Sequence, residues 1–175
     1  MKTKTGIVTK VEYTTVMAEA LTQIRKGAFL TVQAKDKLNV MTIGWASLGL
    51  MWARPSLTIM VRSSRYTYDI IEQASEFTVS VPTEDMAKAL QVCGVKSGRS
   101  VDKFKESGLE IFPGIKTHTP IINCAGIHFE CGIVYKTALD PKNLVEKYTH
   151  LYPDKDYHTL YFGEIAETYR TLSRQ

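Results

Sequence analysis

Short runs of β-branched and aromatic residues recur along this chain, and they constrain its fold more than any other feature. The runs cover residues 28–34, 40–50, 57–61, 77–81, 123–135 and 157–166. The apolar spacing of amphipathic helices is found instead in residues 15–26, 66–74 and 84–92. Strands that follow one another with only short helices between them are typical of barrels. The sequence therefore predicts a mainly β fold, a mixed β-barrel with peripheral helices.

Length and composition suit a single domain spanning residues 1–175. The chain is 44% hydrophobic and 23% charged, and a domain of this size buries about 70% of its unfolded surface without a metal or disulfide staple. Its three cysteines include no CxxC pair, which favours a reducing, cytoplasmic environment. No apolar stretch is long enough for a secretory signal or a membrane span, so we expect neither.

The charge distribution argues against a nucleic-acid partner. Lys and Arg number 22 against 18 Asp and Glu, a net charge of +4. The basic residues are dispersed, however, and no run of about five to eight of them marks a phosphate-backbone contact. The four histidines lack the spacing of metal ligands, so we expect no metal site. The chain also lacks a nucleophile elbow, a P-loop and a dinucleotide fingerprint.

The densest polar cluster is Arg-Ser-Ser-Arg-Tyr-Thr at residues 62–67, between a predicted strand end and a helix start. Backbone N–H groups of a first helical turn, hydroxyls and two guanidinium groups together favour a phosphate monoester. The alternative is simple N-capping by Ser63 or Ser64. Capping explains one serine but not the two flanking arginines.

Two further segments are candidates for ligand contact. Residues 93–99 place two glycines around Lys96 and Ser97 after a predicted helix, although a helix end at Gly94 followed by a surface turn explains the same pattern. The strand-like run of residues 39–49 contains several small residues, which would let a flat ligand reach the backbone beside Trp45. The alternative is a bulged core strand with Trp45 buried.

Period-two alternation in residues 123–135 assigns two faces to that strand. Cys124, His128 and Glu130 share one face, and Cys131 lies on the other, so Cys124 and Cys131 should point in opposite directions. His128 and Glu130 could form an acid–base pair. A solvated surface pair is the alternative interpretation, and the pattern favours it.

The order of these motifs resembles the flavin reductase-like family of FMN-binding split barrels, which includes flavoredoxin. The resemblance extends from about Gly27 to Glu167. Its most specific parts are residues 39–45, 61–67, 77–81, 93–94 with 96–99, and 102–104. It implies an FMN-binding split β-barrel, a homodimer with FMN near the subunit interface, and hydride or electron transfer through the flavin.

The resemblance also implies roles for individual residues. The isoalloxazine ring would lie against Met41, Thr42, Ile43, Gly44, Trp45, Ala46 and Ser47. The phosphate would be held by Arg62, Ser64, Arg65 and Thr67, and the ligand would be covered by Lys96 and Ser97.

His158 is the catalytic candidate that the resemblance suggests. Many flavin reductases carry Gly-Asp-His near the last strand, where this chain has Asp156, Tyr157 and His158. The tripeptide belongs to members that accept hydride from NAD(P)H. Asp156 and Tyr157 depart from its first two residues, so the use of a nicotinamide donor is the part of the resemblance that this departure affects. A neutral imidazole there could donate a hydrogen bond to the incoming carboxamide or steady the reduced ring. A strand-end histidine bonded to a backbone carbonyl is the alternative.

The expected function is that of an FMN-binding oxidoreductase of the flavin reductase type. It would pass hydride or electrons from NADH or NADPH through bound FMN to a small-molecule or protein acceptor. Two alternatives stay open from the sequence. One is a flavoredoxin-like electron carrier with a protein partner, and the other is a non-catalytic flavin-binding module.

Overall fold

The computed structural model describes residues 2–3 and 6–172 and is built around one nine-stranded sheet with antiparallel pairing. Its main path runs through β1 (Lys2–Thr3), β2 (Gly6–Lys10), β11 (His158–Thr171), β10 (Gly126–Ala138), β7 (Glu76–Pro82), β3 (Ala28–Ala34) and β4 (Lys37–Ile43). A hairpin of β5 (Ala46–Met51) and β6 (Arg54–Arg62) attaches to β11. A small separate sheet contains β8 (Ile111–Phe112) and β9 (Ile121–Ile122).

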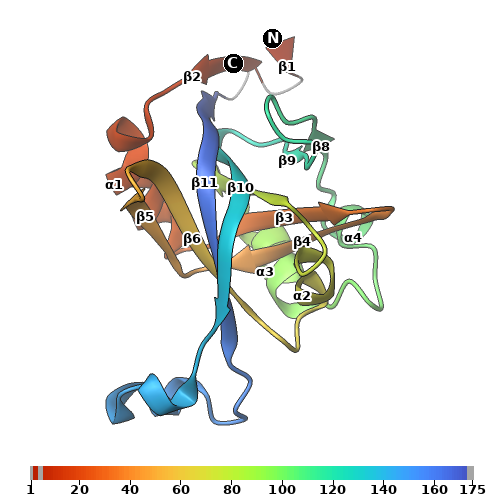
Figure 1. Ribbon diagram of the computed structural model, residues 1–175. Helices are drawn as coiled ribbons and strands as arrows, with labels where there is room; N and C mark the ends of the chain where they lie inside the picture. Colours follow the sequence, from red (N-terminus) through yellow and green to blue (C-terminus); the bar gives the residue numbers. More distant parts are fainter. Residues whose placement is uncertain (1, 4–5, 173–175) are drawn as a thin grey trace.

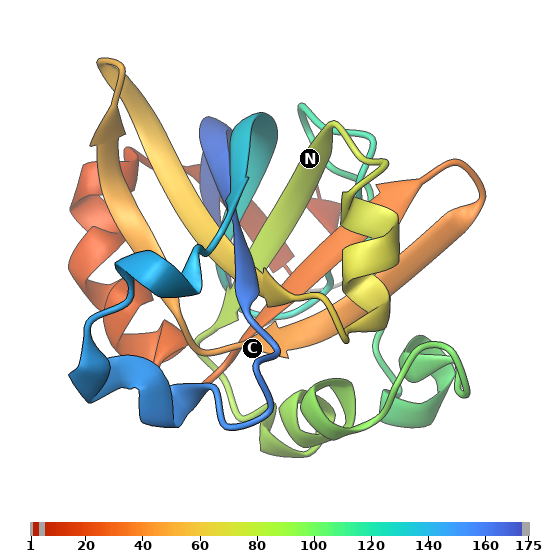
Figure 2. The same cartoon turned by 60° about the horizontal axis from the view of Figure 1, so that its bottom comes forward.

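Short helices surround this sheet, as Figures 1 and 2 show. They are α1 (Tyr13–Ile24), α2 (Tyr66–Ile71), α3 (Ala87–Val95) and α4 (Lys103–Ser107), with 3-10 turns η1 (Pro141–Asn143) and η2 (Glu146–Leu151). The prediction of a mainly β barrel with peripheral helices is confirmed. None of the helices among the described residues has the length and apolar character needed to cross a membrane.

Both faces of β3 are buried, which explains its nearly continuous apolar run. Leu30 belongs to the main core cluster, with Ile24 of α1 and Phe129 of β10. The adjacent Phe29 belongs to a second cluster, which includes Cys93 of α3. Successive strand residues point to opposite faces, so a strand covered on both sides must be apolar at almost every position.

The predicted strand at 40–50 is two strands, which is a correction. β4 ends at Ile43 and pairs with β3, whereas β5 starts at Ala46 and pairs with β6. Gly44 and Trp45 carry the chain from one half of the barrel to the other. A run of apolar residues shows that a segment is extended, but it does not show which strand is its partner.

The tight turn that follows β5 lies at Trp52 and Ala53, and β6 starts directly after it, at Arg54. Both turn residues have positive φ, 52° and 57°. Hairpin turns of this conformation usually carry Asn or Gly, so the sequence offers no recognisable signal here. A second two-residue turn, Lys35 and Asp36, joins β3 to β4, which starts at Lys37.

His128 and Glu130 are both fully buried, so the surface-pair interpretation is wrong. The His128 ring lies between the hydroxyls of Ser80 and Thr171, at 3.1 and 2.9 Å. The Glu130 carboxylate accepts hydrogen bonds from the backbone N–H groups of residues 115–117. The two side chains therefore serve separate structural networks. Cys124 and Cys131 do lie in opposite core clusters, as the alternation predicts.

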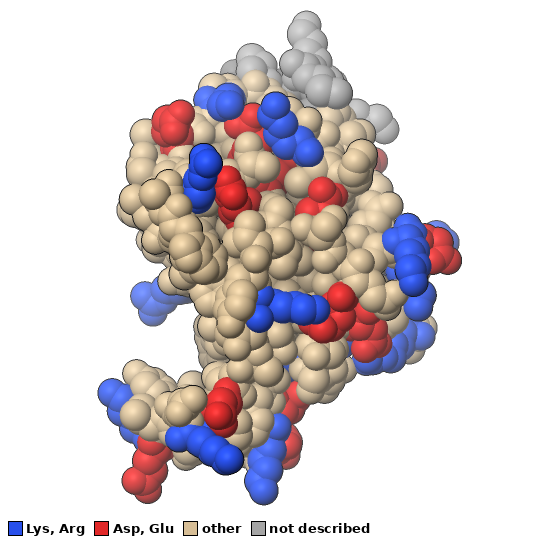
Figure 3. Space-filling model, viewed as in Figure 1, with Lys and Arg blue, Asp and Glu red and all other residues tan. Residues whose placement is uncertain are grey.

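A long excursion at residues 139–157, here called the arm, separates β10 from β11 and carries η1 and η2. Figure 1 shows it projecting from the end of the two longest strands. In the space-filling view a notch separates it from the body of the molecule (Figure 3). The arm returns the chain to His158, and its last residues lie beside the start of α2.

Candidate functional site

Three pockets that share lining residues follow one another along β4 and the start of β5, and together they are here called the groove. The first, the anion pocket, lies at the start of α2 and shares Met41 with the middle pocket, which has a volume of about 220 Å³. The middle pocket shares Gly44, Trp45 and Met60 with the end pocket, which has a volume of about 500 Å³. The groove therefore leads from a polar, cationic end to an apolar one.

Lys103 is the most unusual residue of the anion pocket. It is only 5% exposed, and its Nζ donates a 2.8 Å hydrogen bond to the backbone carbonyl of Cys93. No carboxylate among the described residues forms an ion pair with it. Burial lowers the pKa of Lys103; the neighbouring Cys93 acts in the opposite direction, and the positive charge of Arg65 adds to the lowering. Lys103 and Arg65 both line this pocket, and neither forms an ion pair with a carboxylate in the described part of the chain, so the pocket is a site for an anion.

The sequence alone gives Lys103 no role, although residues 102–104 belong to the pattern that resembles the family. The side chain of Asp102 caps α4 by accepting from the N–H groups of Phe104 and Lys105. This cap places Lys103 in the first turn of α4. A lysine in that position is usually exposed, so only the packing of α4 against α3 shows that it is buried.

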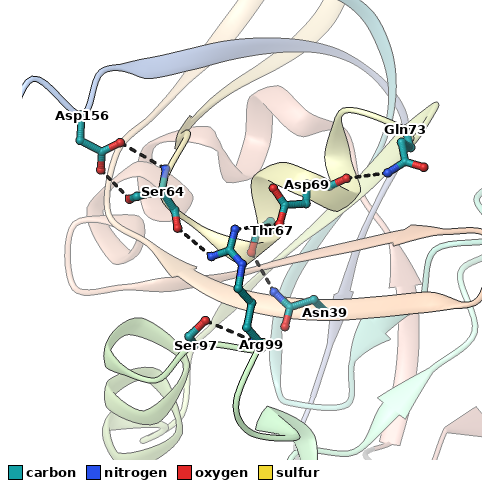
Figure 4. Close-up of polar contacts among 8 residues, drawn as sticks. All are labelled: Asn39, Ser64, Thr67, Asp69, Gln73, Ser97, Arg99 and Asp156. Atoms are coloured by element: carbon teal, nitrogen blue, oxygen red, sulfur yellow. Dashed lines mark hydrogen bonds and ion pairs between the residues drawn. The ribbon is translucent and has the colours of Figure 1, made fainter.

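The serines at the start of α2 already have an acidic partner. The Asp156 carboxylate accepts from the hydroxyls of Ser63 and Ser64, at 3.1 and 2.5 Å. It also accepts from the Ser64 backbone N–H, and Figure 4 shows its two contacts with Ser64. Although burial raises the pKa of Asp156, these hydrogen bonds lower it overall. Neither serine caps the helix, because Arg65 is the N-cap residue and α2 has no side-chain cap. The capping interpretation is therefore wrong, and Ser64 lies at the edge of the anion pocket.

Arg62, a predicted phosphate ligand, lines the middle pocket and anchors the arm. Its guanidinium donates to the backbone carbonyls of Asp156 and Leu151, at 2.8 and 3.0 Å. It also lies 4.9 Å from the ring centroid of Tyr152. These contacts direct Arg62 toward the arm, and of the two arginines in the motif only Arg65 lines the anion pocket.

Arg99 fixes the 96–101 loop over the first turn of α2, as Figure 4 shows. Its guanidinium donates to the Ser64 carbonyl at 2.9 Å and forms a 2.7 Å ion pair with Asp69. The hydroxyl of Ser97 accepts from the Arg99 backbone N–H. Lys96 lines the pocket, and its Nζ pairs with Glu106. This loop is therefore a fixed wall of the anion pocket, and the helix end expected at Gly94 lies beyond it, at Val95.

Thr67 contributes to the inner wall of the anion pocket and is 1% exposed. Its hydroxyl accepts a 2.9 Å hydrogen bond from the Asn39 amide. Gly98 packs directly over this pair, because a Cβ added there would meet the Asn39 side chain and lie 2.7 Å from Tyr66. The close approach requires glycine at this position.

Six of the seven residues predicted to face a flat ring line the groove, and Thr42 does not. Met41, Ile43, Gly44 and Trp45 line the middle pocket, and Gly44, Trp45, Ala46 and Ser47 line the end pocket. The Thr42 hydroxyl instead donates to the Leu90 carbonyl of α3 at 2.6 Å. Strand alternation turns the side chain of Thr42 away from those of its two neighbours.

His158 lies in the wall of the middle pocket, next to Trp45 at a ring-centroid distance of 5.4 Å. Its Nδ1 is 2.8 Å from the Tyr152 hydroxyl, so the alternative interpretation, a backbone-carbonyl partner, is wrong. Burial and the charge of Arg62 lower the pKa of His158 to about 4. The imidazole is therefore neutral at pH 7.

Comparison with known proteins gives one consistent result. The family model of the flavin reductase like domain matches residues 25–173. The fold is similar to that of an FMN-binding domain of a flavin reductases-like enzyme from Shewanella baltica, with a TM-score of 0.68 and 20% identity over 97% of this chain and 80% of that one. A flavoredoxin from Methanosarcina acetivorans is 28% identical, with a TM-score of 0.63 over 82% of this chain and 67% of that one.

An NADH:FAD oxidoreductase from Streptomyces globisporus shares the fold at 21% identity, with a TM-score of 0.62 over 82% of this chain and 74% of that one. The sheet-rich architecture therefore agrees with that of the flavin reductase-like split barrels. Because the family model covers most of the sequence, the chain belongs to the flavin reductase-like family.

Proposed function

We propose that this protein is an FMN-binding oxidoreductase of the flavin reductase type. The observation that carries the proposal is buried Lys103, a cation without a carboxylate partner among the described residues, in a pocket that Met41 joins to an apolar groove. A phosphate monoester would supply the missing negative charge. The apolar groove suits the flat ring of the same ligand.

The residues present fit FMN in a specific arrangement. Lys103 and Arg65 would hold the phosphate, with the polar groups of Thr67, Ser97 and Ser64 around it. Met41, Ile43 and Trp45 would wall the ring. Gly44 and Trp45 lie between β4 and β5, outside both strand ladders, so their backbone N–H groups are available to ring heteroatoms. When bound, FMN supplies hydride and single-electron chemistry.

The protein's own contribution to catalysis is then positioning and electrostatics. Backbone N–H groups and cations along the groove favour negative charge on a bound ring. His158 is neutral and acts as a hydrogen-bonding group in the middle pocket. A ring bound against Trp45 and Met60 would displace water from the middle pocket, which would strengthen these polar contacts.

We further propose NADH or NADPH as electron donor and a small molecule or protein as acceptor. The flavin reductase-like family membership and the fold shared with an NADH:FAD oxidoreductase support a nicotinamide donor. One observation favours a second function, a flavoredoxin-like carrier that exchanges electrons with a protein. Asp156 replaces the glycine of the reductase tripeptide and holds the arm against Ser63 and Ser64.

The absorption spectrum of the purified protein and titrations with FMN and riboflavin test flavin binding. We expect flavin absorption and a clear preference for FMN. A protein that binds neither flavin would refute the proposal. NADH and NADPH oxidation with free flavin or ferric complexes as acceptor then separates the reductase from the carrier and from a non-catalytic flavin-binding module, because only the reductase turns over.

We also propose a cytoplasmic homodimer. Leu50, Trp52 and Tyr135 are 70%, 65% and 52% exposed, and the rings of Trp52 and Tyr135 contact each other. Exposed apolar clusters of this kind commonly mark an interface. Acidic and basic side chains are interspersed on the face in Figure 3. Light scattering should give twice the 19.7 kDa of one chain, and a monomer mass would contradict the dimer.

A further inference from the structure

Tyr152 and His158 form a buried pair where the arm returns to the sheet. The Tyr152 hydroxyl lies 2.8 Å from Nδ1 of His158, and the residues are 6% and 8% exposed. Their rings meet edge to face, at an interplanar angle of 79°. Arg62 covers the Tyr152 ring, and Trp45 lies against the imidazole. Both rings are therefore held in one orientation by contacts on several sides.

The direction of the hydrogen bond between them follows from counting donors and acceptors. Burial raises the pKa of Tyr152, so its phenol keeps its proton at neutral pH. If Nδ1 of His158 donated, this phenol proton would have no acceptor, because the Tyr152 oxygen has no other polar partner in the described part of the chain. Buried hydroxyl groups rarely stay unpaired. Tyr152 therefore donates, Nδ1 accepts, and the imidazole proton lies on Nε2.

The charged groups around His158 keep its ring neutral. Arg62 pairs with His158 across the β6–β11 ladder, and Arg65 lies at the start of α2. Both positive charges disfavour an imidazolium, whereas the Asp156 carboxylate favours it. Burial adds to the effect of the two arginines, and the pKa of His158 is about 4. Only the two neutral tautomers therefore compete at pH 7.

We propose that Tyr152 is a positioning residue that fixes His158 with its proton on Nε2, so that His158 donates one N–H to a flat heteroaromatic ligand in the middle pocket. His158 lines that pocket, and across residues 6–172 no group is paired with Nε2. The Nε2–H group of His158 can donate to a carbonyl oxygen or to an imine-type ring nitrogen of the ligand. Nε2 carries a proton already, so His158 orients the ligand and is not a general base. Only the identity of the ligand rests on the proposed function.

Nitrogen NMR of the ligand-free protein, labelled with nitrogen-15 at histidine, tests the tautomer directly. We expect a protonated Nε2 and an unprotonated Nδ1 for His158 in the wild type. Tyr152→Phe should produce a mixture of both tautomers. Tyr157→Phe is the matched control, because Tyr157 packs on Tyr152 at 5.0 Å and its hydroxyl is not bonded to His158. A protonated Nδ1 in the wild type, or an unchanged tautomer in Tyr152→Phe, would overturn the proposal.

Two substitutions of His158 test the donor toward FMN. The amide of Gln lies close to the position of Nε2 and that of Asn close to Nδ1, so His158→Gln should keep more FMN affinity than His158→Asn. We expect His158→Asn to bind FMN about fivefold more weakly, the effect of one neutral hydrogen bond. Equal losses in the two variants would refute the donor role. If the wild type binds no FMN, the proposed function fails, and the NMR result still decides the role of Tyr152.

Discussion

Replacement of Lys103 by Met removes the buried cation and keeps an unbranched side chain of similar length. In the structure the Nζ of Lys103 has one neutral acceptor, the Cys93 carbonyl, and two further N–H donors for a ligand. A charge-assisted hydrogen bond to phosphate contributes about 1.5–3 kcal/mol. Lys103→Met should therefore weaken FMN binding by about 10- to 150-fold. Riboflavin has no phosphate, so its affinity should change little.

Two effects on the stability of Lys103→Met oppose each other. The variant loses the hydrogen bond to the Cys93 carbonyl near the end of α3, which destabilises it by about 1–3 kcal/mol. It also loses the desolvation penalty of a buried charge, which is of the same order. We therefore expect a melting temperature within a few degrees of the wild type, since about 1 kcal/mol shifts it by about 2–4 °C at this size.

Quenching of flavin fluorescence measures both affinities in one assay. Lys105→Met is the matched control, because the Lys105 side chain lies on the same helix, is 87% exposed and pairs with Asp102 at the surface. The control should bind FMN and riboflavin as the wild type does. If Lys103→Met keeps the wild-type preference for FMN over riboflavin, the phosphate is bound elsewhere and the assignment of the anion pocket is wrong.

Three other substitutions probe the surroundings of the site. Asp156→Ala removes a carboxylate that is bonded to Ser64 at the edge of the anion pocket. FMN should then bind about fivefold more tightly, because about 1 kcal/mol of repulsion between this carboxylate and the phosphate is lost. Weaker binding in FMN titrations would contradict this. His128→Gln should reduce the decrease in the free energy of unfolding at acid pH, because the pKa of His128 is about 4 when folded and about 6.5 when unfolded. The wild type then loses up to about 3 kcal/mol as pH falls through this window, which urea unfolding at pH 7 and pH 4 measures, and equal losses in both proteins would refute it. Gly98→Ala should displace the Asn39 amide and weaken FMN binding, whereas an unchanged affinity would show that the loop can adjust.

Local pattern predicted the elements but not where some of them end. The segments around β3, β7 and β10 are strands, because period-two and continuous apolar runs reflect burial on one or two faces. The division of residues 40–50 was not predictable, since strand partners are chosen by contacts distant in the sequence. The hairpin turn at Trp52 and Ala53 lacks the residues that usually mark such a turn.

The order of the motifs along the sequence was sufficient to identify the flavin reductase-like family and the region of the groove. Residues 41–47 and 62–67 are single continuous segments, so their chemistry and their neighbourhood can be recognised without a fold. Which side chains enter the groove was decided by tertiary structure. Thr42 turns away because β4 alternates, and Arg62 serves the arm because residues 151 and 156 present their carbonyls to it.

The burial of charged and polar groups was also decided only by the folded chain. Lys103 and Glu130 carry charges that a sequence places on the surface by default. Each is buried because another element packs over it, α3 over Lys103 and the 115–117 loop over Glu130. The sequence by itself thus determined the kinds of chemical group and the family. The tertiary structure determined their solvation, partners and protonation, since these depend on atoms that meet only after folding.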